Sequence, residues 1–273
     1  MRSNILIILV FIISNIFQVS GVEELNCSIL NSLNEDESYL CGLELSELGR
    51  IEDAIFLYNR AIAINNSYLD AWYKKLDCLV ALGRCEEVED CCYEISKIIP
   101  PDAAYDLKGT SLKECYKDHW PPTHVEPVEE ESAIDDYEYV IGCFNESIEI
   151  NQNYTSAWNN KGVALGELGR YEESLLCFNK AIEINSSIAE AWNNRGVTLD
   201  YLKEHQEAMD SYNRSIDIDP LLSEAWYNKG STLIRHFGRY EEAGECYNRS
   251  IYLDPELKNV NKQLLYAETY YAK

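Results

Sequence analysis

Apolar and small residues recur along the chain with a period of 34 residues. Trp158, Trp192 and Trp226 mark the period, and each is followed four residues later by glycine and seven residues later by leucine. Inside each copy the apolar positions are three or four residues apart, which is the spacing of one helix face. Two such stretches follow each other in every copy, separated by a short turn such as "LGR". The pattern therefore predicts pairs of amphipathic helices, with Gly169 at a chain reversal.

Weaker copies of this pattern extend the array towards the N-terminus. Trp72 opens one copy, Ser38 opens a degenerate one, and a third begins at Tyr105. The Tyr105 copy continues in register only if residues 117–136 are an insert. The last copy is one residue longer than the others, because "LIRHFGRY" stands where an earlier copy has "LGELGRY". We therefore expect six units, which lie near 38–71, 72–104, 105–157, 158–191, 192–225 and 226–258.

These marks give the chain its resemblance to a known family. The pattern resembles that of the tetratricopeptide repeat (TPR) family, whose 34-residue unit carries Trp, Leu, Gly, Tyr, Ala, Phe, Ala and Pro at set positions. The resemblance implies an all-α, right-handed α-solenoid of about six helix-turn-helix repeats, with Trp and Phe filling the space between successive pairs. It departs from the family at Lys161, which replaces an apolar residue, and at Cys92, which replaces an aromatic one.

The segments outside the repeats have patterns of their own. Residues 259–273 place apolar side chains on one helical face, which predicts a capping helix over the last repeat. Residues 1–21 combine Arg2, an apolar core over 5–17 and the small Gly21, which is the order of a secretory signal. We expect cleavage after Gly21 and a secreted or cell-surface protein, with residues 22–37 as an N-terminal segment. Val19 is bulky for a cleavage site, so an uncleaved membrane anchor is the alternative, and membrane contact is expected only in that case.

The charge excludes one class of partner. The chain has 47 acidic and 23 basic residues, for a formal net charge of −24. Phosphates would be repelled, and no stripe of basic residues exists along the repeats. We therefore expect no nucleic-acid partner.

The ten cysteines give one candidate disulfide. Cys85 begins a second helix and Cys115 ends the antiparallel first helix that follows, so both fall at one end of the array. A disulfide between them is predicted, with two free thiols as the alternative; Cys27 with Cys41 is a weaker candidate pair. Four other cysteines share one repeat position, about 20 Å apart in successive units, which is too far for mutual disulfides. These four are expected to be small, half-buried apolar residues, and they are Cys91, Cys143, Cys177 and Cys246.

Export would also make the Asn-x-Ser/Thr sequons relevant. Asn65, Asn153 and Asn185 fall between units and are the better candidates for glycosylation. Three further sequons fall inside predicted helices and are expected to be incidental.

No catalytic motif is present. The sequence has no phosphate-binding loop, no GxSxG turn and no paired CxxC motif, so we expect neither an enzyme nor a cofactor or metal site. The insert holds His119 and His124 on either side of "WPP", followed by many acids. A solvated, extended loop is the favoured interpretation; the alternatives are a metal site built from both histidines and a carboxylate, or docking of Trp120.

The resemblance also implies where a partner would bind. TPR arrays use the concave wall formed by the first helices of the repeats. Asn160, Asn194 and Asn228 recur on it, and they would bond either a peptide backbone or a neighbouring helix. The lysines that clamp a terminal carboxylate in one subfamily are replaced here by Asn or Tyr. By register, the wall comprises Asn159, Asn160, Val163, Glu167, Asn193, Asn194, Val197, Tyr201, Tyr227, Asn228, Ser231 and Arg235.

These observations favour a non-enzymatic scaffold that binds a protein or peptide, exported or held at the cell surface. The alternative is an accessory or regulatory subunit of an extracytoplasmic enzyme or of an envelope- or glycan-processing complex.

Overall fold

The computed structural model describes residues 33–116 and 131–255, except for the side chains of residues 131–133. All regular secondary structure in these two stretches is helical. The fold is an all-α helical-repeat solenoid, as the periodicity predicts. The predicted signal segment, the capping helix and residues 117–130 of the insert lie outside the described residues. Within the described ranges, no helix combines the length and the apolar character needed to cross a bilayer.

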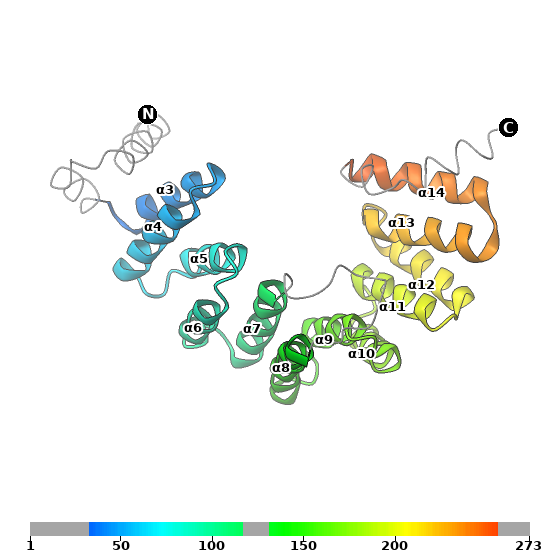
Figure 1. The fold of residues 1–273 in the computed structure, drawn as a ribbon, viewed down its shortest axis with the longest axis horizontal. Helices are drawn as coiled ribbons and strands as arrows, with labels where there is room; N and C mark the ends of the chain where they lie inside the picture. The colour runs from blue at the N-terminus through cyan, green and yellow to red at the C-terminus, as the bar shows by residue number, and fades with distance from the viewer. Residues whose placement is uncertain (1–32, 117–130, 256–273) are drawn as a thin grey trace. The chain divides into compact units, whose positions relative to one another are not determined.

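The chain divides into two compact units, residues 1–121 and 122–273. In the first unit, each helix packs against the next one along the chain, and α5 also contacts α3 and α7 (Figure 1). Its helices are α3 (Glu35–Glu47), α4 (Ile51–Ile64), α5 (Leu69–Ala81), α6 (Cys85–Ile95) and α7 (Pro101–Cys115).

The second unit continues the same pattern. Each second helix packs against its own first helix and against the first helix of the next repeat, while α9, α11 and α13 form one contiguous row. Its elements are α8 (Glu131–Ile150), α9 (Thr155–Glu167), α10 (Tyr171–Ile184), α11 (Ala189–Tyr201), α12 (His205–Ile218), α13 (Ser223–Thr232), a short π-helix η2 (Leu233–Phe237) and α14 (Tyr240–Leu253).

In the pairs α3/α4, α9/α10 and α11/α12, a glycine of the first helix meets a large aromatic ring of the second. A Cβ added to Gly162 would lie 2.8 Å from Cε1 of Phe178, and one added to Gly196 would lie 2.5 Å from Cε1 of Tyr212. Phe178 and Tyr212 are both almost fully buried. Glycine at this position therefore allows the two helices of a pair to approach closely.

The turn between paired helices contains a residue whose backbone is in the left-handed region, with a positive φ. Gly169 has φ of 72° there, as the sequence predicts for a chain reversal. In the fifth repeat the same position is Lys203, with φ of 65°. A lysine adopts this conformation at an energetic cost that glycine avoids.

The tryptophans differ from the expectation that they fill the space between successive pairs. Trp72 is buried, with 8% of its surface exposed, whereas Trp158, Trp192 and Trp226 are only half-buried. All four donate Nε1–H to the backbone carbonyl of the residue six positions earlier, as Trp192 does to Ser186 at 3.0 Å. The indole thus ties each of these first helices to the preceding turn.

The last part of the predicted insert is helical. Residues 131–136 belong to α8, which begins at Glu131 and is 20 residues long. No proline follows Pro127 in this segment, and acidic residues favour the N-terminal turn of a helix. The extended loop expected over residues 117–136 is therefore wrong for its last six residues.

The cysteines separate into a bonded pair and a buried set. Cys85 and Cys115 form a disulfide between the start of α6 and the end of α7, with their Cα atoms 5.8 Å apart. Cys91, Cys143, Cys177 and Cys246 are all buried. Cys41 is also buried, and Cys27 lies outside the described residues.

Candidate partner-binding face

Five asparagines from α9, α11 and α13 form one chain of side-chain amides. Asn228 Nδ2 donates to Asn193 Oδ1 at 3.0 Å, and Asn193 Nδ2 donates to Asn194 Oδ1 at 3.5 Å. Asn194 Nδ2 then donates to Asn159 Oδ1 at 3.3 Å, and Asn159 Nδ2 donates to Asn160 Oδ1 at 3.4 Å. The chain therefore runs in one donor-to-acceptor direction across three successive repeats.

The amide chain shows one of the two roles that the sequence leaves open for the recurring asparagines. Asn194 and Asn228 bond to the neighbouring first helix, which is one of the two alternatives. Each amide nitrogen has two N–H groups, and a link of the chain uses one of them. Asn193 is buried, with 8% of its surface exposed, whereas the other four asparagines are half-buried. Bonding to a neighbouring helix is thus compatible with a second bond to a ligand.

The other predicted wall residues differ in their burial and in their packing contacts. Val163 and Val197 are half-buried, and Val197 packs against the core around Leu199 and Tyr212. Tyr227 is half-buried and contacts the ring of Tyr247, with centroids 5.5 Å apart. We call the exposed and half-buried side chains of this row the first-helix face, comprising Asn159, Asn160, Val163, Glu167, Asn194, Val197, Tyr201, Tyr227, Asn228 and Ser231.

Tyr201 gives this face its most accessible aromatic ring. It lies parallel to Tyr171, with centroids 4.5 Å apart and planes 4° apart, and 40% of its surface is exposed. Burial raises the pKa of Tyr201, with further contributions from Tyr171 and Glu167. The hydroxyl therefore remains protonated at neutral pH and can donate a hydrogen bond.

Arg235 is the one predicted wall residue that the structure places outside the first helices. It lies in the π-helix η2 and is exposed.

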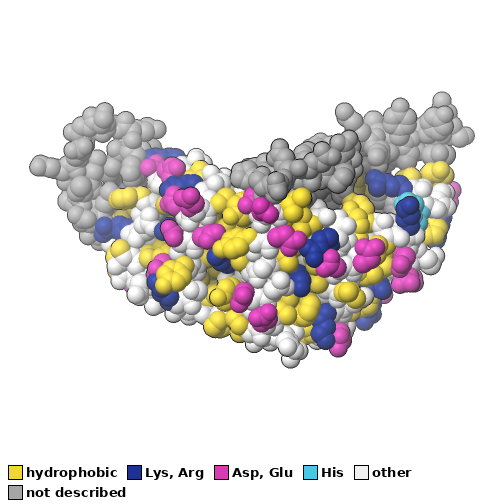
Figure 2. Space-filling view, turned by 60° about the horizontal axis from the view of Figure 1, so that its bottom comes forward, with side chains coloured by type: hydrophobic (Ala, Val, Ile, Leu, Met, Phe, Trp, Pro, Cys, Tyr) yellow, Lys and Arg dark blue, Asp and Glu magenta, His cyan; other side chains and the backbone are white. Residues whose placement is uncertain are grey.

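Lys161, the departure from the family pattern, lies over the ring of Trp158, with Nζ 5.7 Å from its centroid. In the view of Figure 2, acidic and basic side chains are interspersed with apolar ones and are not separated by sign.

The predicted sequons lie in exposed turns between helices. Asn65 and Asn185 end α4 and α10, and the Oδ1 of each accepts the backbone N–H two residues later, at 3.1 and 3.0 Å. Asn153 lies in the turn before α9. All three side chains are exposed, and glycosylation at them remains a prediction.

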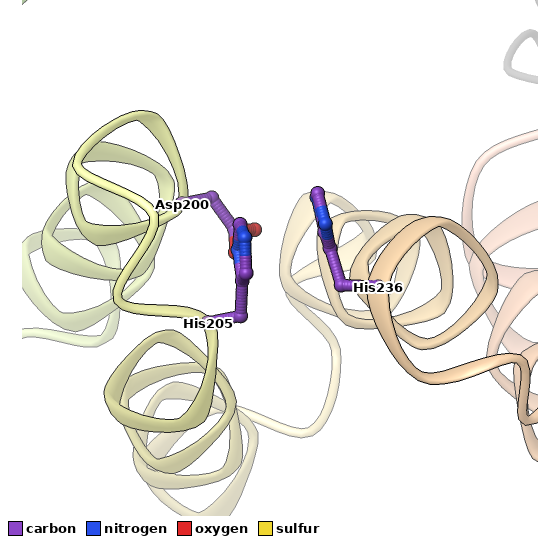
Figure 3. Close-up of side chains that lie close together, drawn as sticks. All are labelled: Asp200, His205 and His236. Atoms are coloured by element: carbon purple, nitrogen blue, oxygen red, sulfur yellow. The ribbon is translucent and has the colours of Figure 1, made fainter.

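A second group of side chains was missed by the sequence reasoning. Asp200, His205 and His236 converge where α11, α12 and η2 meet, with potential ligand atoms within 4.8 Å of one another (Figure 3). Burial and His205 lower the pKa of His236, so its imidazole is neutral at pH 7. The sequence held two signals for this cluster: the extra residue in "LIRHFGRY", and a histidine at position 205 where neighbouring repeats have tyrosine.

Comparison with known families finds repeats at four places along the chain. Tetratricopeptide repeat models match residues 39–68, 155–187, 189–220 and 223–257. The chain contains tetratricopeptide repeats. Proteins built from these repeats act as protein- or peptide-binding scaffolds.

Solved TPR structures share the fold at low sequence identity. TTC0263, a TPR protein of Thermus thermophilus, aligns with a TM-score of 0.55 and 16% identity, over 73% of this chain and 99% of its own. An ArsTM double mutant of MamA RS-1 aligns with a TM-score of 0.50 and 15% identity, over 71% and 98%. An uncharacterized protein of Methanocaldococcus jannaschii is 40% identical over 55 residues, which are 20% of this chain and 64% of that protein. At these identities the solved structures establish the fold alone.

Proposed function

We propose that this TPR protein is a non-enzymatic scaffold that binds a protein or peptide along the first-helix face. The amide chain carries the proposal, because it holds five side-chain amides at fixed positions across three repeats. Amides fixed by neighbouring amides lose little further rotamer freedom when a ligand binds. The second N–H groups of the half-buried Asn159, Asn194 and Asn228 are donors suited to the carbonyl oxygens of an extended peptide.

The side chains around the amides suit a peptide of mixed character. Val163 and Val197 offer apolar contacts, and Tyr201 offers an exposed ring with a hydroxyl donor. The chain's formal charge of −24 favours a partner that is neutral or basic. A peptide ending in an acidic tail would meet no row of lysines on this face.

Selection from a random peptide library tests the proposal. Selected peptides should bind the wild-type chain and lose about tenfold or more in affinity with Asn194→Ala, since that change removes one donor to the peptide, worth about 1 kcal/mol, and the two links that fix Asn193 and Asn159. Asn213→Ala is the matched control, because Asn213 is exposed on the second helix α12. Circular dichroism of both variants separates lost binding from lost folding. Equal binding by all three proteins would place the binding surface elsewhere.

We also propose that the protein is exported. The order of charge, apolar core and small residue in residues 1–21 supports export. The Cys85–Cys115 disulfide supports it too, because disulfides persist mainly in oxidising compartments. N-terminal sequencing of the protein from its native cells should begin at Val22; a chain that retains Ile5 would instead indicate an anchor.

A further inference from the structure

We propose that Asp200, His205 and His236 bind one divalent transition-metal ion, of which Zn²⁺ is the prototype, at the junction of the fifth and sixth repeats. We call these three residues the Asp–His cluster. Imidazole nitrogen and carboxylate oxygen are common zinc ligands, and three protein ligands leave a coordination position open.

The spacing of the cluster suits an ion between the side chains. Nδ1 of His205 lies 3.0 Å from Oδ1 of Asp200, and the rings of His205 and His236 stack with centroids 3.4 Å apart and planes 11° apart. Two nitrogens bound to one tetrahedral zinc ion are about 3.4 Å apart, given Zn–N bonds of about 2.1 Å, and the ligand atoms of the cluster lie within 4.8 Å of one another. The nitrogens of nearly parallel rings do not point at one atom, so one ring must turn. His236 is exposed and lies on the short π-helix, where such a rotation meets little packing.

Both histidines stand where their repeat departs from the pattern of its neighbours. Asp200 occupies a position that varies between repeats, with Gly166 in the fourth and Ile234 in the sixth, whereas His205 occupies the position of Tyr171 and Tyr240. The extra residue of the sixth repeat falls in Leu233–Phe237, which adopts a π-helix that includes His236. Single-turn π-helices are frequently found at functional sites. Two independent departures thus bring both histidines to the Asp200 carboxylate, with ligand atoms within 4.8 Å of one another.

A second layer of hydrogen bonds holds the carboxylate in place. Oδ2 of Asp200 accepts from the hydroxyl of Tyr212 at 2.9 Å and from the hydroxyl of Thr232. Tyr212 and Thr232 are both buried. Carboxylate ligands of metal sites are typically oriented by such outer partners, and here they leave Oδ1 directed at His205.

Some groups near the cluster disfavour a bound cation, and the Asp200 carboxylate is the group that favours one. His205 is the first residue of α12, and the N-terminal end of a helix disfavours a cation. Arg235 beside His236 disfavours one as well. The negative charge of Asp200 offsets both effects at the ligand atoms. The site is therefore expected to exchange its ion with solvent and to accept a further ligand from water or a partner.

Titration of the full chain with Co²⁺ tests the proposal, because tetrahedral Co²⁺ absorbs visible light and reports its ligands. One Co²⁺ per chain should bind and be displaced by Zn²⁺. His205→Tyr restores the residue of the neighbouring repeats, so it should fold normally and weaken binding at least tenfold. Thr232→Val should weaken it by about 10- to 100-fold through the carboxylate.

His124→Ala is the matched histidine control, because His124 belongs to the insert. Binding that survives His124→Ala and is lost in His205→Tyr supports the Asp–His cluster. No Co²⁺ spectrum in the wild-type chain, or a spectrum unchanged by His205→Tyr, would overturn the proposal. Loss of binding in His124→Ala alone would also overturn it, and would assign the ion to the insert.

Discussion

The ring of Tyr212 lies so close to Gly196 that the two residues fix the spacing between α11 and α12. A Cβ on Gly196 would be 2.5 Å from Cε1 and 2.7 Å from Cδ1 of Tyr212. The same tyrosine donates its hydroxyl to Asp200. One side chain thus connects the packing inside the fifth repeat to the Asp–His cluster beside it.

Gly196→Ala should therefore destabilise the second unit. The added methyl group overlaps a ring that is fully enclosed, and overpacking of this kind costs about 1–3 kcal/mol. Gly142→Ala is the matched control, because a Cβ at Gly142 in α8 meets nothing within 4 Å. That variant should be neutral or stabilised by up to about 1 kcal/mol, since alanine favours helix formation. Urea unfolding followed by circular dichroism compares them, and equal midpoints would contradict the packing.

Trp72→Ala should cost more stability than Trp192→Ala. Trp72 is buried, so its truncation should cost about 3–5 kcal/mol. Trp192 is half-buried and loses mainly partial packing and one hydrogen bond, for which we expect about 2–3 kcal/mol. Chemical unfolding of both variants gives the comparison. A larger loss from Trp192→Ala would show that its ring is more enclosed than the structure indicates.

The Cys85–Cys115 disulfide should stabilise the first unit. It closes a loop with a sequence separation of 30 residues, and the chain-entropy model assigns about 3–4 kcal/mol to such a loop. Unfolding of the oxidised protein should therefore require more denaturant than unfolding of the Cys85→Ser/Cys115→Ser variant. Peptide mapping of the native protein checks the pairing, and a Cys27–Cys41 peptide in its place would contradict it.

The buried thiols should react slowly. Burial raises the pKa of Cys91 to about 11, and burial with nearby Glu44 raises that of Cys41 to about 11. The thiolate is the reactive form, so both remain protonated thiols at pH 8 and their thiolates form only as the pH approaches 11. Thiol-reagent labelling at pH 8 should be slow in the folded protein and fast in denaturant. Rapid labelling of Cys91 in the folded state would contradict its burial.

The repeat register could be predicted from sequence because it depends on local spacing. The 34-residue period located the helix pairs, the reversal at Gly169 and the positions of Cys85 and Cys115. The burial of Trp192 could not be predicted, because periodicity assigns a face and not the depth to which a ring enters it. The Asp–His cluster escaped prediction because His205 and His236 are far apart in sequence. Only packing of successive repeats brings them together.

The sequence suggested both roles of the recurring asparagines but not the amide chain that connects them. Asn194 and Asn159 meet only because α9 and α11 are neighbours in one row. The recurrence of asparagine at one repeat position was visible, but the direction of the amide chain depends on side-chain rotamers. Tertiary geometry therefore supplied the observation on which the proposed function depends.

Site-specific photo-crosslinking tests the central claim, that a partner binds the first-helix face, most directly. A photoreactive phenylalanine would replace Tyr201 or Val163 on that face, and Asn213 or Tyr252 on second helices as controls. Tyr252 is 76% exposed, so its reagent is fully accessible. In native cells, we predict that the same discrete crosslinked product forms from Tyr201 and Val163 and not from the two controls. Equal products from all four positions, or products from the second helices alone, would contradict the account.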